Sequence, residues 1–253
     1  SFSDGGRWSD PAAAINRGRE LAASGADVVD VGGESTRPGA EPVDVTHELA
    51  RVVPVVEALA GEGVVVSIDT SKPEVAEAAI SAGAEIVNDV TGLSEPAIVE
   101  ICAASGVGIV VMHMLGEPRT MQIAPSYSDV VDEVAEFLRR RTDAAIASGV
   151  DASRIVVDPG IGFGKTIDHN LALLNGIDRI GGGRPVLVGA SRKRFLGTIL
   201  ERAGRPSTPA DRDVATAATV ALAVERGAAI LRVHDVAGAV DAARTADAIV
   251  RSR

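Results

Sequence analysis

Polar and charged residues follow seven short apolar runs of this chain, each at the point where the run ends. In chain order the segments are Asp30-Val-Gly-Gly-Glu-Ser-Thr-Arg-Pro-Gly, Ser67-Ile-Asp-Thr, Val87-Asn-Asp-Val, Val111-Met-His-Met, Val157-Asp-Pro-Gly-Ile-Gly-Phe-Gly-Lys, Gly189-Ala-Ser-Arg-Lys-Arg-Phe and Leu231-Arg-Val-His-Asp. Their carboxylates can accept hydrogen bonds, and their Lys, Arg and His side chains can bind anions. Because burying such groups is costly unless they are paired or solvated, seven in succession predict a ring of functional groups around one site.

The segment from Gly189 to Phe195 has the residues best suited to binding an anion. An apolar run leads through Ser191-Arg-Lys-Arg directly into a predicted helix. Its cationic side chains then lie beside the free N–H groups of a helix N-terminus, which favour negative charge. Arg232 and His234 are two residues apart on one predicted strand, so we expect them to share a face and form a second cationic pair.

The overall charge limits the possible partners. The formal net charge is −10 at pH 7, whereas a nucleic-acid-binding protein needs a basic stripe. We therefore expect no nucleic-acid partner. An anionic substrate must be captured by local cations, because the field of the whole molecule repels it.

The glycine-rich segment Gly160-Ile-Gly-Phe-Gly-Lys-Thr does not meet either common nucleotide-binding pattern. A P-loop needs a glycine five residues before Gly164, where this chain has Pro159. The dinucleotide fingerprint also fails, since the glycines alternate with single residues instead of following its spacing.

The histidines divide into two groups and do not predict a zinc site. All four are scattered, and none forms a His-x-His pair. His113 and His234 end predicted strands, where we expect functional roles. His47 and His169 lie in helical segments and are expected at the surface. Asp89 fits equally well as a site residue and as a residue that ties down a loop or caps a helix.

The elements that must position these residues are short strands alternating with helices. The predicted strands, each rich in Val and Ile, are Val28–Gly32, Val64–Asp69, Ile86–Asp89, Gly108–His113, Ile155–Asp158, Val186–Ser191 and Ile230–His234. First helical turns are predicted at Pro11, Pro73, Pro96 and Pro209, and Ser128 is expected to cap a long amphipathic helix ending near Gly149.

This alternation predicts a single α/β domain over residues 1–253, either a doubly wound sheet or a (β/α)8 TIM barrel. We favour the barrel because polar residues end every strand, whereas an open sheet gathers its site at one switch point. A barrel needs eight strands and seven are found, so we expect the first strand to be missing from this chain, upstream of Ser1.

Composition sets the remaining limits. Hydrophobic residues make up 46% of the chain and charged residues 24%, an ordinary globular balance. The single cysteine, Cys102, excludes an intrachain disulfide and is expected to be a small core residue. No apolar run reaches transmembrane length and no signal-peptide pattern opens the chain, so we expect no membrane partner and a cytoplasmic location.

Seven motifs in this order resemble the dihydropteroate synthase family across essentially the whole chain. They are Ser1-Phe-Ser-Asp-Gly-Gly, Gly32-Gly-Glu-Ser-Thr-Arg-Pro-Gly, Ser67-Ile-Asp-Thr, Asn88-Asp-Val, Asp158-Pro-Gly-Ile-Gly-Phe-Gly-Lys, Ser191-Arg-Lys and Arg232-Val-His-Asp. The implied reaction condenses 6-hydroxymethyl-7,8-dihydropterin pyrophosphate with p-aminobenzoate, giving 7,8-dihydropteroate and pyrophosphate.

The resemblance also implies a role for each matching residue. The residues implied to bind the pterin are Asp69, Asn88, Met112, Asp158, Phe163 and Lys193. Those implied for p-aminobenzoate and the loops around it are Ser3, Asp4, Thr36, Arg37 and Arg194, the last standing where many relatives carry Ser. Arg232 and His234 are expected to hold the pyrophosphate, and the catalytic residues are expected to be Lys193, Asp69, Arg232 and His234.

The family further implies a Mg2+ cofactor, a homodimer and inhibition by sulfonamides. The Asn that helps to bind Mg2+ in the family lies upstream of Ser1, so no metal ligand is assigned within this chain. Three alternatives remain open. They are a methyltetrahydrofolate-binding methyltransferase domain, which needs no pyrophosphate clamp, a non-catalytic pterin-binding paralogue, and a Schiff-base aldolase using Lys193.

Overall fold

Parallel strands alternate with helices throughout the computed structural model, which describes residues 10–36 and 39–252. The strands are β1 (Val29–Gly32), β2 (Val66–Asp69), β3 (Ile86–Asp89), β4 (Gly108–Met112), β5 (Ile155–Asp158), β6 (Leu187–Val188) and β7 (Ile230–Leu231). The helices are α1 (Pro11–Ala23), α2 (Val45–Gly61), α3 (Pro73–Ser81), α4 (Pro96–Ser105), α5 (Val130–Ala147), α6 (Ile167–Asn175), α7 (Ile177–Ile180), α8 (Arg194–Arg202), α9 (Asp213–Glu225) and α10 (Val236–Arg251). Two 3-10 turns, η2 (Ala152–Arg154) and η3 (Pro209–Arg212), precede β5 and α9.

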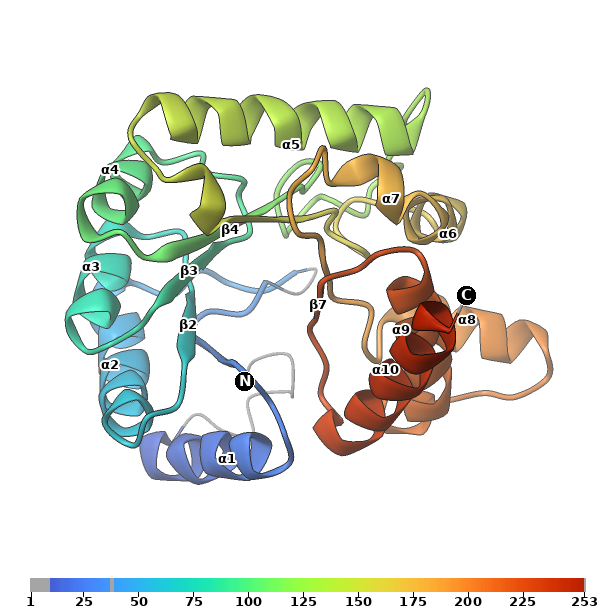
Figure 1. Ribbon diagram of the computed structural model, residues 1–253, viewed down its shortest axis with the longest axis horizontal. Coiled ribbons are helices and arrows are strands. Elements are labelled where there is room, and N and C mark those ends of the chain that lie inside the picture. The colour runs from blue at the N-terminus through green and yellow to red at the C-terminus, as the bar shows by residue number, and fades with distance from the viewer. Residues whose placement is uncertain (1–9, 37–38, 253) are drawn as a thin grey trace.

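The strands follow one another in chain order around a wall, with the helices outside it (Figure 1). Strands β1 to β5 form one parallel sheet, β6 and β7 form another, and a parallel bridge from Val157 to Val186 joins the two. This order agrees with the predicted barrel and not with a doubly wound sheet, which reverses its strand order at a switch point. In the described part of the chain β1 and β7 do not pair with each other, and Arg17 of α1 crosses that edge to donate to the His234 carbonyl oxygen at 3.3 Å.

The strand register brings the functional ends to one level. Asp69 lies beside Asn88 in the β2–β3 ladder, and Met112 lies beside Asp158 in the β4–β5 ladder. Because all the strands are parallel, their carboxyl ends open on the same side. The residues predicted to form a ring at the strand ends therefore do lie side by side on β2 to β5.

The predicted element starts agree with the structure in most places. Asp10 caps α1, accepting from the Ala13 N–H at 3.0 Å, and Pro11 is the first helical residue. The cap of α5 is Asp129, not Ser128, because the Asp129 carboxylate accepts from two free N–H groups of the first turn. Strands β6 and β7 are only two residues long, shorter than the predicted strands Val186–Ser191 and Ile230–His234.

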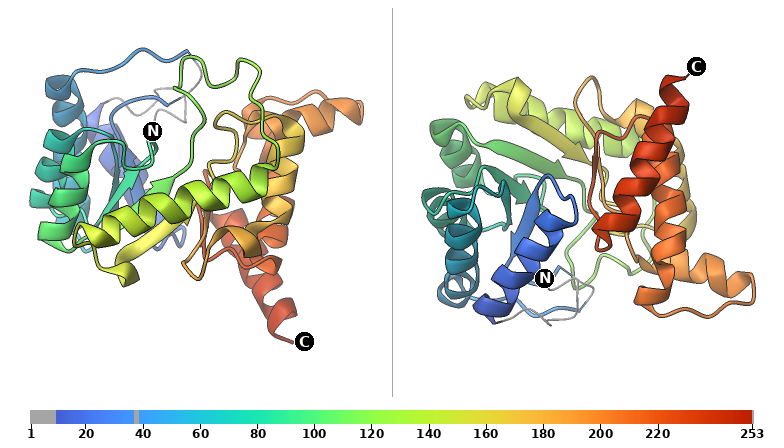
Figure 2. Two further views of the ribbon diagram at one scale, coloured as in Figure 1. Left: turned by 90° about the horizontal axis from the view of Figure 1, so that it is seen from above. Right: turned by 60° about the horizontal axis from the view of Figure 1, so that its bottom comes forward.

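The helices lie against the outer face of the strand wall (Figure 2), and the hydrophobic core is formed between these two layers. Leu59, Ile98 and Leu138 from the helices are almost fully buried against strand residues such as Ile68 and Ile109. Each such side chain contributes about 1.5–3 kcal/mol through removal from water.

Two further features bear on the expectations from composition. Cys102 is buried in α4 as a free thiol, and burial raises its pKa to about 12, which confirms the prediction of a core residue. Among the described residues, every helix is too short or too polar to span a membrane.

Candidate active site

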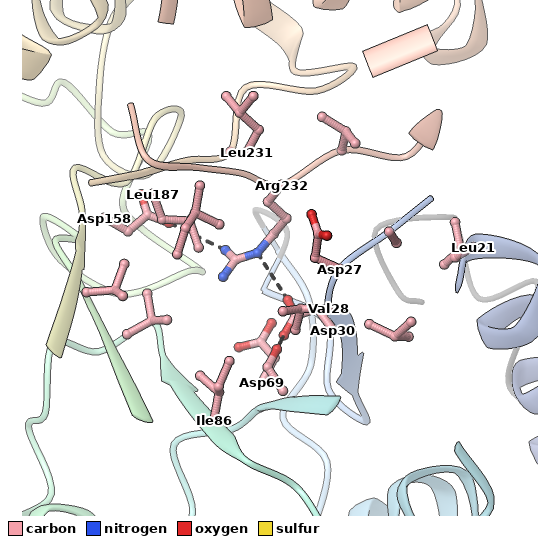
Figure 3. Close-up of a pocket in the computed structure, with 18 of the residues that line it drawn as sticks. Leu21, Asp27, Val28, Asp30, Asp69, Ile86, Asp158, Leu187, Leu231 and Arg232 are labelled. Atoms are coloured by element: carbon pink, nitrogen blue, oxygen red, sulfur yellow. Dashed lines mark hydrogen bonds and ion pairs between the residues drawn. The ribbon is translucent and has the colours of Figure 1, made fainter. Parts of the chain in front are cut away.

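A cavity of about 950 Å³ occupies the interior of the strand wall, and its lining extends from the amino ends of the strands, at Glu85 and Arg154, to their carboxyl ends. The predicted site residues that line it include Thr36, Asp69, Asp158, Phe163, Lys193, Arg232 and His234. Residues from β1, β2, β5 and β7 thus meet in one space although they are far apart in the chain. Figure 3 shows three of its carboxylates, Asp30, Asp69 and Asp158, around the guanidinium of Arg232.

Asp69 and Asn88 form the first hydrogen-bonded pair of the pocket. The Asn88 side-chain N–H donates to Asp69 Oδ1 at 2.9 Å, and Asn88 is fully buried. Asp158 is also buried, and its Oδ1 accepts from the Gly160 N–H at 2.7 Å. Each carboxylate keeps acceptor capacity for a ligand with several N–H donors.

Arg232 lies across this pocket. Its Nε is 3.1 Å from Asp30 Oδ2, Nη1 is 3.4 Å from Asp158 Oδ2, and Nη2 donates to Asn88 Oδ1 at 2.9 Å. Burial lowers the pKa of this guanidinium, but the surrounding carboxylates outweigh that effect and raise it. Arg232 and His234, which were expected to share a face, both line this cavity.

Lys193 enters the pocket from the turn before α8. Its ammonium donates to the Ile161 carbonyl oxygen and lies 4.1 Å from the centroid of the Phe163 ring, a cation–π contact. Burial lowers the pKa of Lys193 to about 8, and the nearby Arg232 lowers it further while Asp158 opposes the shift.

The carboxyl of Asp69 is perturbed in the opposite sense. Burial raises its pKa to about 7, the charge of Asp30 adds to the increase, and Arg232 opposes it. A carboxyl and an amine with pKa values moved towards neutrality in one cavity are typical of a functional site.

The glycine-rich loop after β5 is shaped to approach the end of β4. Gly160 has φ +66°, and a Cβ there would lie 1.9 Å from the His113 carbonyl oxygen. Only glycine fits this position. The loop thereby brings Phe163 and the carbonyl of Ile161 to Lys193.

Lys165, for which the sequence predicted no role, supports the same glycine-rich loop. Its buried ammonium is 3.0 Å from His113 Nδ1 and donates to the Phe163 carbonyl oxygen at 2.9 Å. Burial and the neighbouring Lys165 lower the pKa of His113 to about 3, so its ring is neutral and accepts from the lysine. His113 therefore holds Lys165, and through it the loop that carries Phe163.

His234 and Asp89, both predicted at strand ends, have different surroundings in the structure. Ser191 Oγ lies 2.8 Å from His234 Nδ1 and accepts from the His234 backbone N–H at 3.2 Å, so His234 does face the site. Asp89 accepts from the Thr91 and Leu93 N–H groups and closes the loop after β3. Of the two roles considered for Asp89, the structure therefore shows the one of fixing a loop.

The remaining predicted residues have different positions. Ser3, Asp4 and Arg37 lie outside the described residues. Arg194 is the first residue of α8 and is exposed, and Met112 is buried at the end of β4. The resemblance assigned no role to Asp30 or Lys165, although both stand in motifs at strand ends, which is the signal that could have revealed them.

A parallel α/β barrel with carboxylates, an amide and a lysine converging at the strand ends defines an enzyme-like site for a planar, hydrogen-bonding ligand. The family model described as "Pterin binding enzyme" matches residues 1–234. The chain belongs to the pterin binding enzyme family.

Relatives with names and solved structures agree with this assignment. Dihydropteroate synthase of Mycobacterium leprae is 50% identical over 253 residues, covering 98% of this chain and 89% of that protein. The Yersinia pestis dihydropteroate synthase in a sulfonamide complex superimposes with a TM-score of 0.94 at 39% identity, covering 100% of this chain and 90% of that one. The Burkholderia cenocepacia dihydropteroate synthase complexed with 7,8-dihydropteroate superimposes with a TM-score of 0.88 at 47% identity, covering 96% of this chain and 89% of that one.

Proposed function

We propose that this protein is a dihydropteroate synthase, a transferase that joins a dihydropterin pyrophosphate to p-aminobenzoate. The observation that carries the proposal is the convergence of Asp69, Asp158 and Lys193 in one cavity, with the buried Asn88 hydrogen-bonded to Asp69. Carboxylates can accept from the amino and ring N–H groups of a pterin, and a lysine can donate to its carbonyl. Relatives at 41–50% identity carry the same name over nearly the whole chain.

Arg232 must exchange with the pterin for this to happen. Asp158 and Asn88 are engaged by its guanidinium, which is planar and rich in N–H donors, as the amino-pyrimidine edge of a pterin is. A pterin that takes these acceptors releases Arg232 towards the mouth. There, with His234, it can bind the departing pyrophosphate.

The reaction breaks the C–O bond to pyrophosphate heterolytically, and the electron pair leaves with that group. The resulting cation is delocalised into the pterin ring, where the buried carboxylates stabilise it. The amine nitrogen of p-aminobenzoate then forms the new C–N bond and loses a proton. The protein contributes mostly position and charge, and the p-aminobenzoate carboxylate is expected near the N-terminus of α8.

Mg2+ is proposed as the cofactor on chemical grounds. Residues 10–36 and 39–252 contain no group of three or more His, Cys, Asp or Glu side chains placed to hold a metal. Mg2+ is often bound mainly through substrate phosphates and water, so it fits here as an ion that arrives with the substrate. When bound, it would offset the negative charge of the leaving pyrophosphate.

A homodimer is also proposed, through the outer face of α9 and α10. These helices pack side by side, and Val214, Leu222 and Ile249 expose 76%, 55% and 57% of their surfaces. Exposed apolar residues grouped on one face favour association. Light scattering on the wild type and on Leu222→Glu tests the idea, with a monomeric wild type contradicting it. A cytoplasmic location stays a prediction.

The experiment for the catalytic proposal is p-aminobenzoate-dependent release of pyrophosphate from the dihydropterin pyrophosphate, with and without Mg2+. Release that needs both the amine and Mg2+ supports the proposal. Pterin binding without release indicates the non-catalytic paralogue instead. Asp158→Asn should abolish pterin binding in calorimetry, because an amide cannot accept from two donors, and near-normal affinity would remove Asp158 from the pocket assignment.

A further inference from the structure

The turn that delivers Lys193 to the cavity contains a residue in an unusual backbone conformation. Arg192 has φ +57°, in the region that favours glycine or asparagine. The Lys193 N–H donates to the Ala190 carbonyl oxygen at 3.3 Å, so Arg192 is the third residue of a tight turn. Turns with positive φ at this position usually have glycine there. A disfavoured conformation at a site residue's neighbour needs an external cause.

Residues 212–216, at the start of α9, hold Arg192 in this conformation through its side chain and its backbone. The guanidinium forms a two-point ion pair with Asp213, with Nε to Oδ1 at 2.7 Å and Nη2 to Oδ2 at 2.8 Å. The Arg192 backbone N–H donates to Thr216 Oγ1 at 3.1 Å, and Arg212 Nη1 donates to the Arg192 carbonyl oxygen at 3.0 Å. Side chain, donor and acceptor of one residue are thus all held by residues 212–216.

Thr216 and Arg212, which hold the backbone of Arg192, are themselves fixed by further contacts. Thr216 is buried and its hydroxyl donates to the Arg212 carbonyl oxygen at 2.9 Å. Arg212 also donates to the Ser207 carbonyl oxygen at 3.0 Å, and it lies against Gly197 of α8, where a Cβ would come within 2.5 Å of its Nη2. Helices α8 and α9 therefore enclose the turn between them.

The two residues beside Arg192 are the ones that reach the site. Ser191 is hydrogen-bonded to His234, and Lys193 reaches Ile161 and Phe163 inside the cavity. If the turn relaxed, both Ser191 and Lys193 would be displaced, because they are the neighbours of the strained residue. The geometry of two site groups then depends on one ion pair outside the cavity.

We propose that Arg192 and Asp213 are positioning residues, which hold the 190–193 turn so that Lys193 and His234 are aligned for the pterin and its pyrophosphate. This rests on the proposed function. Neither residue contacts substrate in this scheme. Displacing a site group by about 1 Å can cost on the order of a hundredfold in rate, so a small relaxation of the turn has a large effect.

Arg192→Gly separates positioning from local stability. Glycine accepts positive φ without strain, so local stability is retained. Loss of the ion pair nevertheless frees the turn to adopt other conformations, and Lys193 is no longer held in place. We expect kcat/KM to fall by about tenfold or more, with a melting midpoint within a few degrees of the wild type. Asp213→Asn should lower kcat/KM by a smaller factor. Asp213→Glu, which retains the carboxylate, should have a kcat/KM between that of Asp213→Asn and that of the wild type.

Glu62→Ala is the matched control, since it removes a two-point Arg19–Glu62 ion pair on the exposed surface. It should leave kcat/KM unchanged. Arg192→Gly that keeps kcat/KM within about twofold would overturn the proposal. So would a loss of activity that follows only the loss of folded protein.

Calorimetric binding of 6-hydroxymethylpterin keeps the inference testable apart from turnover. A wild type that binds the pterin but releases no pyrophosphate contradicts the proposed function alone. In that case Arg192→Gly should still weaken pterin binding by about tenfold, because Lys193 is displaced. Unchanged pterin affinity in this variant would overturn the positioning role.

Discussion

Arg232 Nε lies 3.1 Å from Asp30 Oδ2, and this ion pair links β1 to the segment after β7, although β1 and β7 do not pair with each other in the described part of the chain. The same guanidinium reaches Asp158 and Asn88, two of the groups expected to bind the pterin. Without ligand, Arg232 therefore occupies acceptors that the substrate needs. A protein whose binding-competent state is only partly populated has a correspondingly reduced apparent affinity.

Asp30→Asn should raise the affinity for 6-hydroxymethylpterin several-fold. The substitution weakens the hold on Arg232, so less free energy is needed to displace it from Asp158 and Asn88. Calorimetry on the two proteins measures the change. Asp27→Asn is the control, because Asp27 is exposed at the same cavity and an equal gain there would mean that only net charge matters.

Pterin affinity should follow a bell-shaped pH profile. Asp69, with its pKa raised to about 7, must lose its proton to accept from the pterin, so affinity rises as pH increases through that value. Lys193, with its pKa lowered to about 8, must keep its proton to donate, so affinity falls above it. Calorimetry across this range tests both limbs. In Asp69→Asn the residual binding should lack the acidic limb, and an unaltered profile would contradict the assignment.

Lys165→Met should destabilise the fold by about 1–3 kcal/mol, because it removes the donor from the Phe163 carbonyl and from His113. The His113 ring stays buried and the Phe163 carbonyl half-buried in the variant. Denaturant unfolding measures the loss. Arg139→Met provides the comparison, since its ion pairs are exposed and should contribute little. Equal effects of the two substitutions would contradict the structural role of Lys165.

Gly160→Ala should be far more damaging than Gly63→Ala. Both glycines have positive φ, +66° and +81°, so both variants suffer the same kind of backbone strain. Nothing lies within 4 Å of a Cβ at Gly63, whereas one at Gly160 would collide with the His113 carbonyl oxygen. We expect about 1 kcal/mol for Gly63→Ala and at least about 2 kcal/mol more for Gly160→Ala. Similar unfolding free energies for the two variants would show that the loop can move away without cost.

The sequence by itself determined where the strands lie and which residues end them. Short Val- and Ile-rich runs separated by helical segments are local patterns, so all seven strands were placed within a few residues of their observed positions. Parallel strands in chain order then bring their carboxyl ends together. Asp69, Asn88 and Asp158 could therefore be assigned to one site before any side chain was located.

Only the tertiary structure decided which of these groups pair with one another. Arg232 was expected beside His234, yet its partners Asp158 and Asn88 are 74 and 144 residues away in the chain. His113 looks like a catalytic residue until Lys165 is found on its ring nitrogen, and the conformation of Arg192 is set by Asp213 and its neighbours on α9. Such pairings depend on side-chain directions where distant strands and helices converge, and no local pattern in the sequence records them.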